Sequence, residues 1–267
     1  MYKTFKHHNP AQATEAMWFV VLWPNTYDEA GQLKSETING TTTNFSYDAG
    51  GNIRTKGSDT FHYDDTNWHD LLTKINATDI LYDELGNPDK TINSRNETVL
   101  LEWQGRQLLK ATMPDGSYET YAYNADGLRT SRTLFDENDN WTRKHEYSWS
   151  DGQLVGQQWS MPVNSQYPNG QTEDVKYIYD DGEIIGFVFN NQTGSASRLF
   201  AKNLQGDIVG IVSGQTNVLM TTYSYDAWGV PTVEFGNDNW QFVWGHGYRG
   251  YQYDLETGAL LLSESVL

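Results

Sequence analysis

The residues best suited to chemistry in this 267-residue sequence are its 6 histidines and 35 carboxylates. Metal sites need His and carboxylate side chains that converge from fixed spacings. The nearest approach is the segment His62–His69, which also holds two aspartates, and we expect solvated turn residues there. Asp136–Asn140 has the alternation of a calcium loop but lacks the glycine and the later bidentate glutamate. An ordinary acidic turn is therefore expected at that position.

Nucleophilic catalysis has no support in the sequence. There is no cysteine, which excludes a thiol nucleophile, a disulfide framework and a cysteine-based metal site. There is also no Gly-x-Ser-x-Gly elbow of the kind that exposes a catalytic serine. Pairs of carboxylates, which glycoside hydrolysis would need, are no evidence of catalysis here, because any chain with 35 acidic residues contains such pairs. We predict a chain that is not an enzyme, with no cofactor and no metal site.

A repeated motif, Tyr-Asp-x-x-Gly, predicts the strands and turns of the chain. It occurs at Tyr27–Gly31, Tyr47–Gly51, Tyr82–Gly86 and Tyr225–Gly229, and Tyr123–Gly127 has Asn for Asp. The tyrosines of neighbouring units fall at positions 27, 47, 63, 82, 123 and 147, so most steps are about twenty residues, which is the length of two short strands with their turns. Asp favours the first position of a type I turn, and Gly supplies the left-handed residue of a three-residue loop with a bulge. The repeat therefore predicts antiparallel hairpins.

This turn also predicts a register, in which each tyrosine faces the residue six positions later. Tyr27 then faces Leu33 and Tyr47 faces Ile53, a favourable pairing of an aromatic with a branched aliphatic side chain. The other three copies place Pro88, Arg129 and Pro231 at that position.

Asp-Gly pairs predict two-residue hairpin turns elsewhere. These turns would pair Tyr179 with Ile184, Trp149 with Leu154 and Met113 with Tyr118.

Composition and charge restrict the partners. The net charge of −17 argues against nucleic acid and against anionic membrane surfaces, which demand clustered Lys and Arg. The longest apolar stretch, residues 16–23, is too short to span a bilayer and lacks a cleavage site of the signal-peptide kind. The 17 Tyr and 10 Trp residues suit a curved sheet with at least one wet face.

Three segments of the second half carry a family resemblance. Lys202–Ile211, the copy at Tyr225–Gly229 and Gly247–Gly258 follow one another, and the last contains Arg249, Gly250, Tyr253 and Asp254. This ordered series resembles the core-associated segment of rearrangement-hotspot (Rhs) proteins, the YD-repeat family. The resemblance runs from about Tyr27 to Leu262. We accordingly expect an atypical segment at 1–24, YD-repeat hairpins at 25–160, a loop at 161–171 and a truncated core-associated segment at 172–267.

The resemblance implies an all-β fold, a ribbon of antiparallel hairpins forming a β-spiral arc of a hollow shell. In the family, the shell encloses a C-terminal toxin polypeptide and is secreted or carried at the cell surface. The implied partners are the remainder of an Rhs shell and an enclosed toxin. Many members release the toxin by self-cleavage at Asp-Pro motifs, but this sequence contains no Asp-Pro, so no autoprotease residue is carried over.

Two other functions remain open. Exposed Trp and Tyr on a sheet could stack on sugars, which would make the chain a carbohydrate-binding module with a glycan partner. The chain could also be a degenerate remnant with no function of its own. In either case an isolated arc leaves strand edges unpaired, which predicts self-association.

Overall fold

The computed structural model describes residues 25–38, 40–93, 95–164, 167–236, 246–254, 257 and 259–261. These residues form antiparallel strands and one 3-10 turn, η1 (Tyr248–Gly250), which confirms the predicted all-β fold. The atypical segment 1–24 lies outside the described residues. The strands are β1 (Thr26–Tyr27), β2 (Leu33–Ile38), β3 (Thr41–Tyr47), β4 (Ile53–Lys56), β5 (Asp59–His62), β6 (Lys74–Ile75), β7 (Thr78–Asp79), β8 (Lys90–Ile92), β9 (Thr98–Gln104), β10 (Gln107–Thr112), β11 (Tyr118–Tyr123), β12 (Arg129–Phe135), β13 (Trp141–Ser150), β14 (Gln153–Met161), β15 (Gln171–Asp180), β16 (Glu183–Asn191), β17 (Gly194–Lys202), β18 (Ile208–Ser213), β19 (Leu219–Tyr225), β20 (Pro231–Phe235), β21 (Gln252–Asp254) and β22 (Ala259–Leu261).

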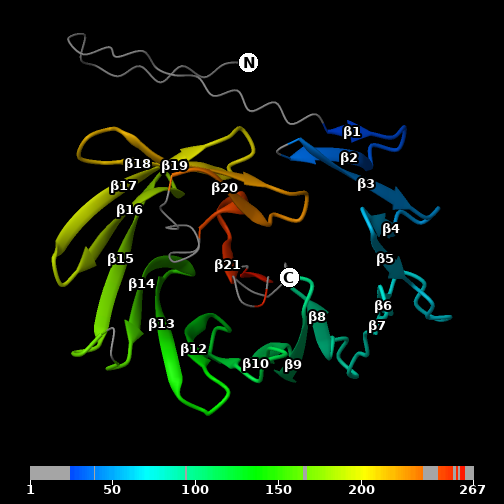
Figure 1. Cartoon of the computed structure of the whole chain (residues 1–267), viewed down its shortest axis with the longest axis horizontal. Helices are drawn as coiled ribbons and strands as arrows, with labels where there is room; N and C mark the ends of the chain where they lie inside the picture. Colours follow the sequence, from blue (N-terminus) through cyan, green and yellow to red (C-terminus); the bar gives the residue numbers. More distant parts are fainter. Residues whose placement is uncertain are drawn as a thin grey trace, which may run out of the picture.

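The strands follow one another in space as they do in sequence. Strands β1–β7 form one sheet, β8–β20 form a sheet of 13 strands, and β21 pairs with β22. Figure 1 shows the two large sheets curving in one direction, with β21 on the concave side. The segment between β14 and β15 joins two paired strands of the larger sheet. The ribbon of hairpins therefore bends around the C-terminal strand pair.

All five copies of the repeat form the predicted turn. At Asp48, one carboxylate oxygen accepts the N–H groups of Gly50 and Asn52 at 2.9 and 3.0 Å, and Gly51 is left-handed with φ +90°. The predicted register is confirmed in every copy, including those without an aliphatic partner. The pairs are Tyr27–Leu33, Tyr47–Ile53, Tyr82–Pro88, Tyr123–Arg129 and Tyr225–Pro231.

Two of the three predicted Asp-Gly turns are confirmed. Tyr179 pairs with Ile184 and Trp149 with Leu154. The third was wrong, because Tyr118 pairs with Thr112 instead of Met113. Pro114 precedes Asp115-Gly116 and its ring fixes a negative φ, which favours the first central position of a type I turn. Only Gly116 is left-handed there, at φ +88°, and it closes a bulged loop of the repeat's own kind.

An aromatic ladder connects successive hairpins. At each step the hydroxyl or indole N–H of an aromatic residue near a strand end donates to a backbone carbonyl one hairpin earlier. The steps are Tyr82 to Leu72, Trp103 to Pro88, Tyr123 to Leu108, Trp149 to Arg129, Tyr179 to Leu154 and Tyr225 to Ile208. Pro88, Leu108, Arg129 and Leu154 are themselves paired with Tyr82, Trp103, Tyr123 and Trp149. Trp103, Tyr123, Trp149 and Tyr179 thus each bind the carbonyl of the residue paired with the preceding aromatic residue of the ladder.

A seam brings the first hairpins against the last repeat turn, about 170 residues later. We define it as Glu36, Phe45 and Lys56 on one side, with Asp226, Ala227 and Trp228 on the other. The N–H of Ala227 donates to Glu36 at 2.9 Å, and Lys56 Nζ lies 2.7 Å from an Asp226 oxygen. Trp228 stacks on Phe45 with its ring centre 5.3 Å away, and Lys56 lies 4.0 Å from the Trp228 ring. Side-chain contacts therefore join the first sheet to the last repeat turn of the larger sheet.

Trp228→Ala is expected to loosen the seam while leaving the large sheet intact. The stacking and cation–π contacts together contribute about 1–2 kcal/mol. Hydrogen exchange should therefore accelerate in β2–β4 and stay slow in β15–β16. Trp141→Ala is the matched control, because Trp141 is 40% exposed and Trp228 is 41% exposed, yet Trp141 lies outside the seam. Equal exchange in the two variants would contradict a closing role for the seam.

Candidate functional site

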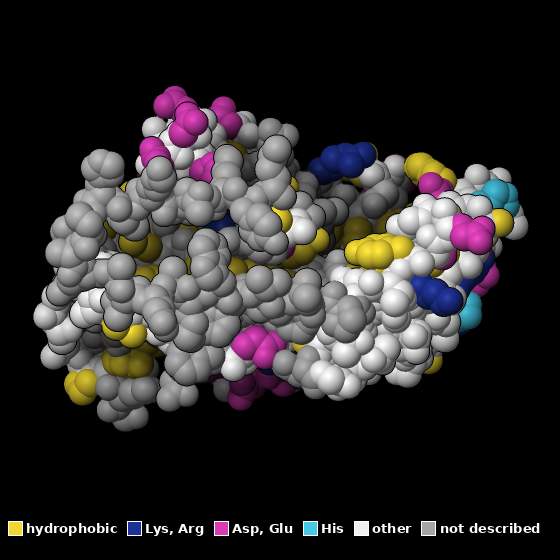
Figure 2. Space-filling view, turned by 90° about the horizontal axis from the view of Figure 1, so that it is seen from above, with side chains coloured by type: hydrophobic (Ala, Val, Ile, Leu, Met, Phe, Trp, Pro, Cys, Tyr) yellow, Lys and Arg dark blue, Asp and Glu magenta, His cyan; other side chains and the backbone are white. Residues whose placement is uncertain are grey.

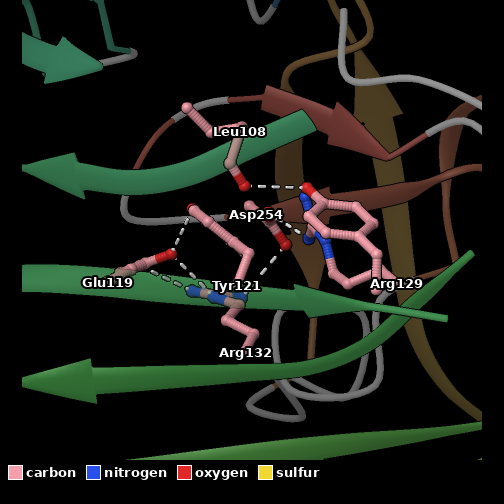
Figure 3. Close-up of polar contacts among 7 residues, drawn as sticks. Leu108, Glu119, Tyr121, Arg129, Arg132 and Asp254 are labelled. Atoms are coloured by element: carbon pink, nitrogen blue, oxygen red, sulfur yellow. Dashed lines mark hydrogen bonds and ion pairs between the residues drawn. The ribbon is translucent and has the colours of Figure 1, made fainter. Parts of the chain in front are cut away.

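A buried ionic cluster ties the C-terminal strand pair to the concave face of the large sheet (Figure 3). Asp254, on β21, accepts hydrogen bonds from Arg129 at 2.7 Å and from Arg132 at 3.1 Å, both on β12. Glu119, on β11, holds Arg132 through two further bonds of 2.8 and 2.9 Å. The Tyr121 hydroxyl donates to Glu119 at 2.6 Å. Two guanidinium groups and two carboxylates are thus paired out of contact with water.

The repeat turn determines which side chains enter the cluster. Along β11, residues 119, 121 and 123 alternate toward one face, as every second strand residue does. Arg129 and Arg132 are three positions apart and would ordinarily point to opposite faces. The bulge after the turn at Tyr123–Gly127 pairs Arg129 with Tyr123 and Arg132 with Tyr121, and this extra residue brings both arginines to the face of their partners.

The charges of the cluster stabilise one another against burial. Burial alone would raise the pKa of Asp254, but Arg129 and Arg132 hold that pKa below its usual value. Burial likewise opposes the charge of Arg129, while Asp254 raises the pKa of this arginine. The pKa of Tyr121 is raised well above its usual value by burial and then by Glu119, so its hydroxyl stays protonated and donates.

His145 lies beside the cluster as a neutral group. Its ring is buried on β13 and pairs across the ladder with Arg132. Burial, and then the charges of Arg132 and Arg143, hold the pKa of His145 well below its usual value. A third positive charge is therefore kept out of a site that already contains two guanidinium groups.

Acidification is expected to destabilise the chain through His145. Unfolded histidine binds a proton below about pH 6.5, whereas the folded ring resists protonation. Stability is then full above pH 6.5 and falls on acidification by up to about 1.4 kcal/mol per pH unit. Denaturant unfolding between about pH 7.5 and 5.5 should show this slope in the native chain and lose it in His145→Gln. An unchanged slope in the variant would contradict this role for His145.

The C-terminal segment also contacts the far end of the large sheet. The backbone N–H of Ile208 donates to the carbonyl of Gly247 at 3.1 Å. The His246 ring meets Tyr177 edge-on, with ring centres 4.3 Å apart. Gly229 faces Tyr248 so closely that a β-carbon there would lie 2.7 Å from the ring. The segment 246–254 therefore contacts both β18–β20 and β11–β12.

The structure brings together only some of the residues that the sequence singled out. Asp254 enters the ionic cluster, and Tyr123 and Arg129 lie beside it. Gly250 is left-handed at the end of η1, with φ +75°. The backbone of Arg249 belongs to η1 and that of Tyr253 to β21, while Gly258 lies outside the described residues. The repeat tyrosines and glycines are spread along the whole ribbon, and their stabilising role stays a prediction.

The sequence reading missed Glu119, Arg132 and His145 as members of one site. One signal was available: Glu119 alternates with Tyr121 and Tyr123, so that a carboxylate falls on an otherwise aromatic face. The reading also missed turns of the repeat type that lack the tyrosine. These begin at Asn93, Asp136 and Asn203, each of which accepts two backbone N–H groups through its side chain.

The segments considered for metal binding have other contacts. Asp136 uses a carboxylate oxygen to accept the N–H groups of Asn138 and Asn140, both at 2.9 Å. Asp65, between the two histidines, accepts the N–H groups of Asn67 and Trp68. Over the described ranges, no group of three or more His, Cys, Asp or Glu residues could hold a metal ion.

The tryptophans considered for sugar stacking divide into two groups. Trp103 and Trp149 belong to the aromatic ladder, and Trp228 packs in the seam. Trp68 and Trp141 are exposed, and Trp244 lies outside the described residues. Glycan binding therefore stays an untested prediction.

Acidic side chains are spread over the surface. On the face in Figure 2, Asp and Glu side chains occur in several separate places, and few Lys or Arg side chains are visible. This distribution is typical of a solvated surface. Among the described residues, no helix is long and apolar enough to cross a membrane.

Comparison with known proteins finds an RHS repeat and similarity to WapA proteins. The sequence model described as RHS Repeat matches residues 27–60. The tRNA3(Ser)-specific nuclease WapA of Bacillus spizizenii is 29% identical over 247 residues, as is the tRNA nuclease WapA of Bacillus subtilis strain 168. These matches support the resemblance to the Rhs/YD-repeat family. Each WapA match covers 88% of this chain but only 10% of the WapA protein.

Solved structures show the same fold. The chain is similar to a chain of the TcdB2-TccC3-TEV crystal structure, with a TM-score of 0.50 and 13% identity. It is similar to a chain of the Photorhabdus luminescens Tc holotoxin pore, with a TM-score of 0.51 and 15% identity. Both matches cover 91% of this chain and 16% of the other chain. The likeness extends over the hairpin ribbon and shows the fold alone.

Proposed function

We propose that this chain is a non-catalytic wall segment of a shell that encloses a C-terminal toxin polypeptide. The observation that supports this most directly is the course of the ribbon, which bends around its own C-terminal strand pair and holds it through Asp254. A curved wall with charged anchor points on its concave face suits the sequestration of a polypeptide. The work of such a protein is steric, so it needs no catalytic group.

The matched relatives support a wall segment that is separate from the part with toxic activity. Two matched relatives are named as tRNA nucleases, and the matched region is a tenth of their length. We propose that this region supplies wall structure and that a nuclease or other toxic activity belongs to a different part of such proteins. The remainder of the shell and the enclosed polypeptide are then the partners, and secretion or cell-surface display is part of the same proposal.

Self-association is the expected behaviour of the isolated chain. Strands at the ends of the sheets present unpaired N–H and C=O groups, which invite pairing with other copies. Size-exclusion chromatography should therefore show assemblies larger than one chain. A stable compact monomer would contradict this expectation.

Protease protection tests the enclosing function. A peptide carrying a specific protease site is fused after Leu267, and the same peptide is inserted between Gln215 and Thr216 in the turn before β19. We expect cleavage of the C-terminal site to be at least about tenfold slower, because cleavage requires opening of the surrounding structure. Asp254→Asn should remove the protection by releasing the anchor. Equal cleavage at the two positions would overturn the proposal.

A further inference from the structure

The two arginines of the ionic cluster are positioned by the sheet that carries them. Glu119 binds Nε and Nη2 of Arg132 in a bidentate arrangement, which leaves Nη1 directed at Asp254. The guanidinium of Arg129 lies over the Tyr121 ring, 4.4 Å from its centre. These contacts come from β11 and β12 alone. The sheet therefore holds both guanidinium groups in place without help from β21.

Within the described residues, the sheet supplies one carboxylate to two arginines. Arg129 and Arg132 carry two positive charges, Glu119 supplies one negative charge, and His145 is kept neutral. A second carboxylate comes from Asp254, which lies more than 120 residues further along the chain. Buried ion pairs are stable only when such charges are matched. The concave face therefore presents a net positive site to whatever chain lies against it.

The Arg129 guanidinium has N–H groups beyond the one that donates to Asp254. The Arg129 side chain is fully buried, and its Nη1 donates to Asp254. Its Nε and Nη2 atoms make no hydrogen bond of good geometry within the described residues, while the Tyr123 and Tyr147 hydroxyls lie within looser hydrogen-bonding reach of the guanidinium. A planar carboxylate can bind two parallel N–H donors of one guanidinium group. The site thus offers more donors than Asp254 uses.

We propose that Arg129 and Arg132 form a carboxylate-binding site that the sheet builds in advance of its ligand. In this chain the ligand is the Asp254 side chain. When that side chain is absent, the site accepts another carboxylate of similar size. This rests on the proposed function and deepens it, because the site is the point at which the wall binds the enclosed C-terminal segment through the Asp254 carboxylate.

Chemical rescue tests the site in the full chain. Asp254→Gly removes the carboxylate and leaves space where it lay. We expect formate and acetate to raise the folding equilibrium constant of this variant at least about tenfold, in a saturable manner, since a ligand of the folded state stabilises it by mass action. Chloride at the same ionic strength should not do so, and the native chain should not respond selectively to carboxylates. Equal effects of chloride and acetate on the variant would overturn the proposal.

Two further variants keep the test decisive. Asp254→Asn fills the space with an amide, so acetate should give it no selective stabilisation. Adding Arg129→Met to Asp254→Gly removes half of the site and should abolish the rescue. If Asp254→Gly is unfolded in chloride, refolding yield in acetate becomes the readout, and failure to refold there counts against the site. The rescue does not depend on enclosure, so the protease experiment and this one can fail separately.

Discussion

Replacing Asp254 by Asn is expected to lower the free energy of unfolding by about 3–5 kcal/mol. The change keeps the size of the side chain but removes the charge that Arg129 and Arg132 share. Both guanidinium groups then stay buried, and of the cluster's two carboxylates Glu119 alone remains charged. Urea unfolding followed by circular dichroism at neutral pH measures the loss.

The matched control for this prediction is Glu146→Gln. Glu146 pairs with Lys144 at 2.8 Å, which is as short as the contacts in the cluster, but both side chains are 40% exposed or more. Exposed pairs contribute at most about 1 kcal/mol. If both variants lose the same stability, burial of the cluster has no special consequence and the anchoring role of Asp254 is wrong.

Gly229→Ala is expected to cost about 2–5 kcal/mol. Gly229 is left-handed with φ +81°, a conformation that costs an alanine about 1–2 kcal/mol. An added β-carbon would also lie 2.7 Å from the Tyr248 ring, and overpacking of this kind costs a further 1–3 kcal/mol, roughly. The second contribution reports directly on the contact between the C-terminal segment and the last repeat turn.

Gly86→Ala separates the two contributions. Gly86 occupies the same position of its own repeat, with φ +82°, and an added β-carbon there meets nothing within 4 Å. Gly86→Ala should therefore show the backbone strain alone. Equal losses of stability in the two variants would mean that Tyr248 does not pack against Gly229.

Local chemistry made much of the fold predictable from sequence. Turn geometry at Asp48 and Gly51 depends on residues within five positions of each other, so the register followed from counting. The error at Met113 has the same local origin, since Pro114 changes which turn type the chain prefers. Short-range rules succeed wherever the deciding contacts are near in sequence.

The ionic cluster could not be predicted in the same way. Arg129 and Asp254 are separated by 125 positions, and no local pattern links them. The family resemblance singled out Asp254 but not its partners, which depend on how far the ribbon curves. The seam could not be predicted from local sequence either, because Lys56 and Asp226 meet only after the twist of many hairpins has accumulated.

Enclosure of the C-terminal segment by the hairpin ribbon can be tested directly by thiol labelling. The native sequence has no cysteine, so an introduced one is the only reactive thiol. Thr257 is 3% exposed, whereas Leu204 in the turn before β18 is 92% exposed. Thr257→Cys is expected to react at least about 100-fold more slowly than Leu204→Cys in the folded chain, and faster once Asp254→Asn is added. Equally fast labelling of the two variants would contradict enclosure.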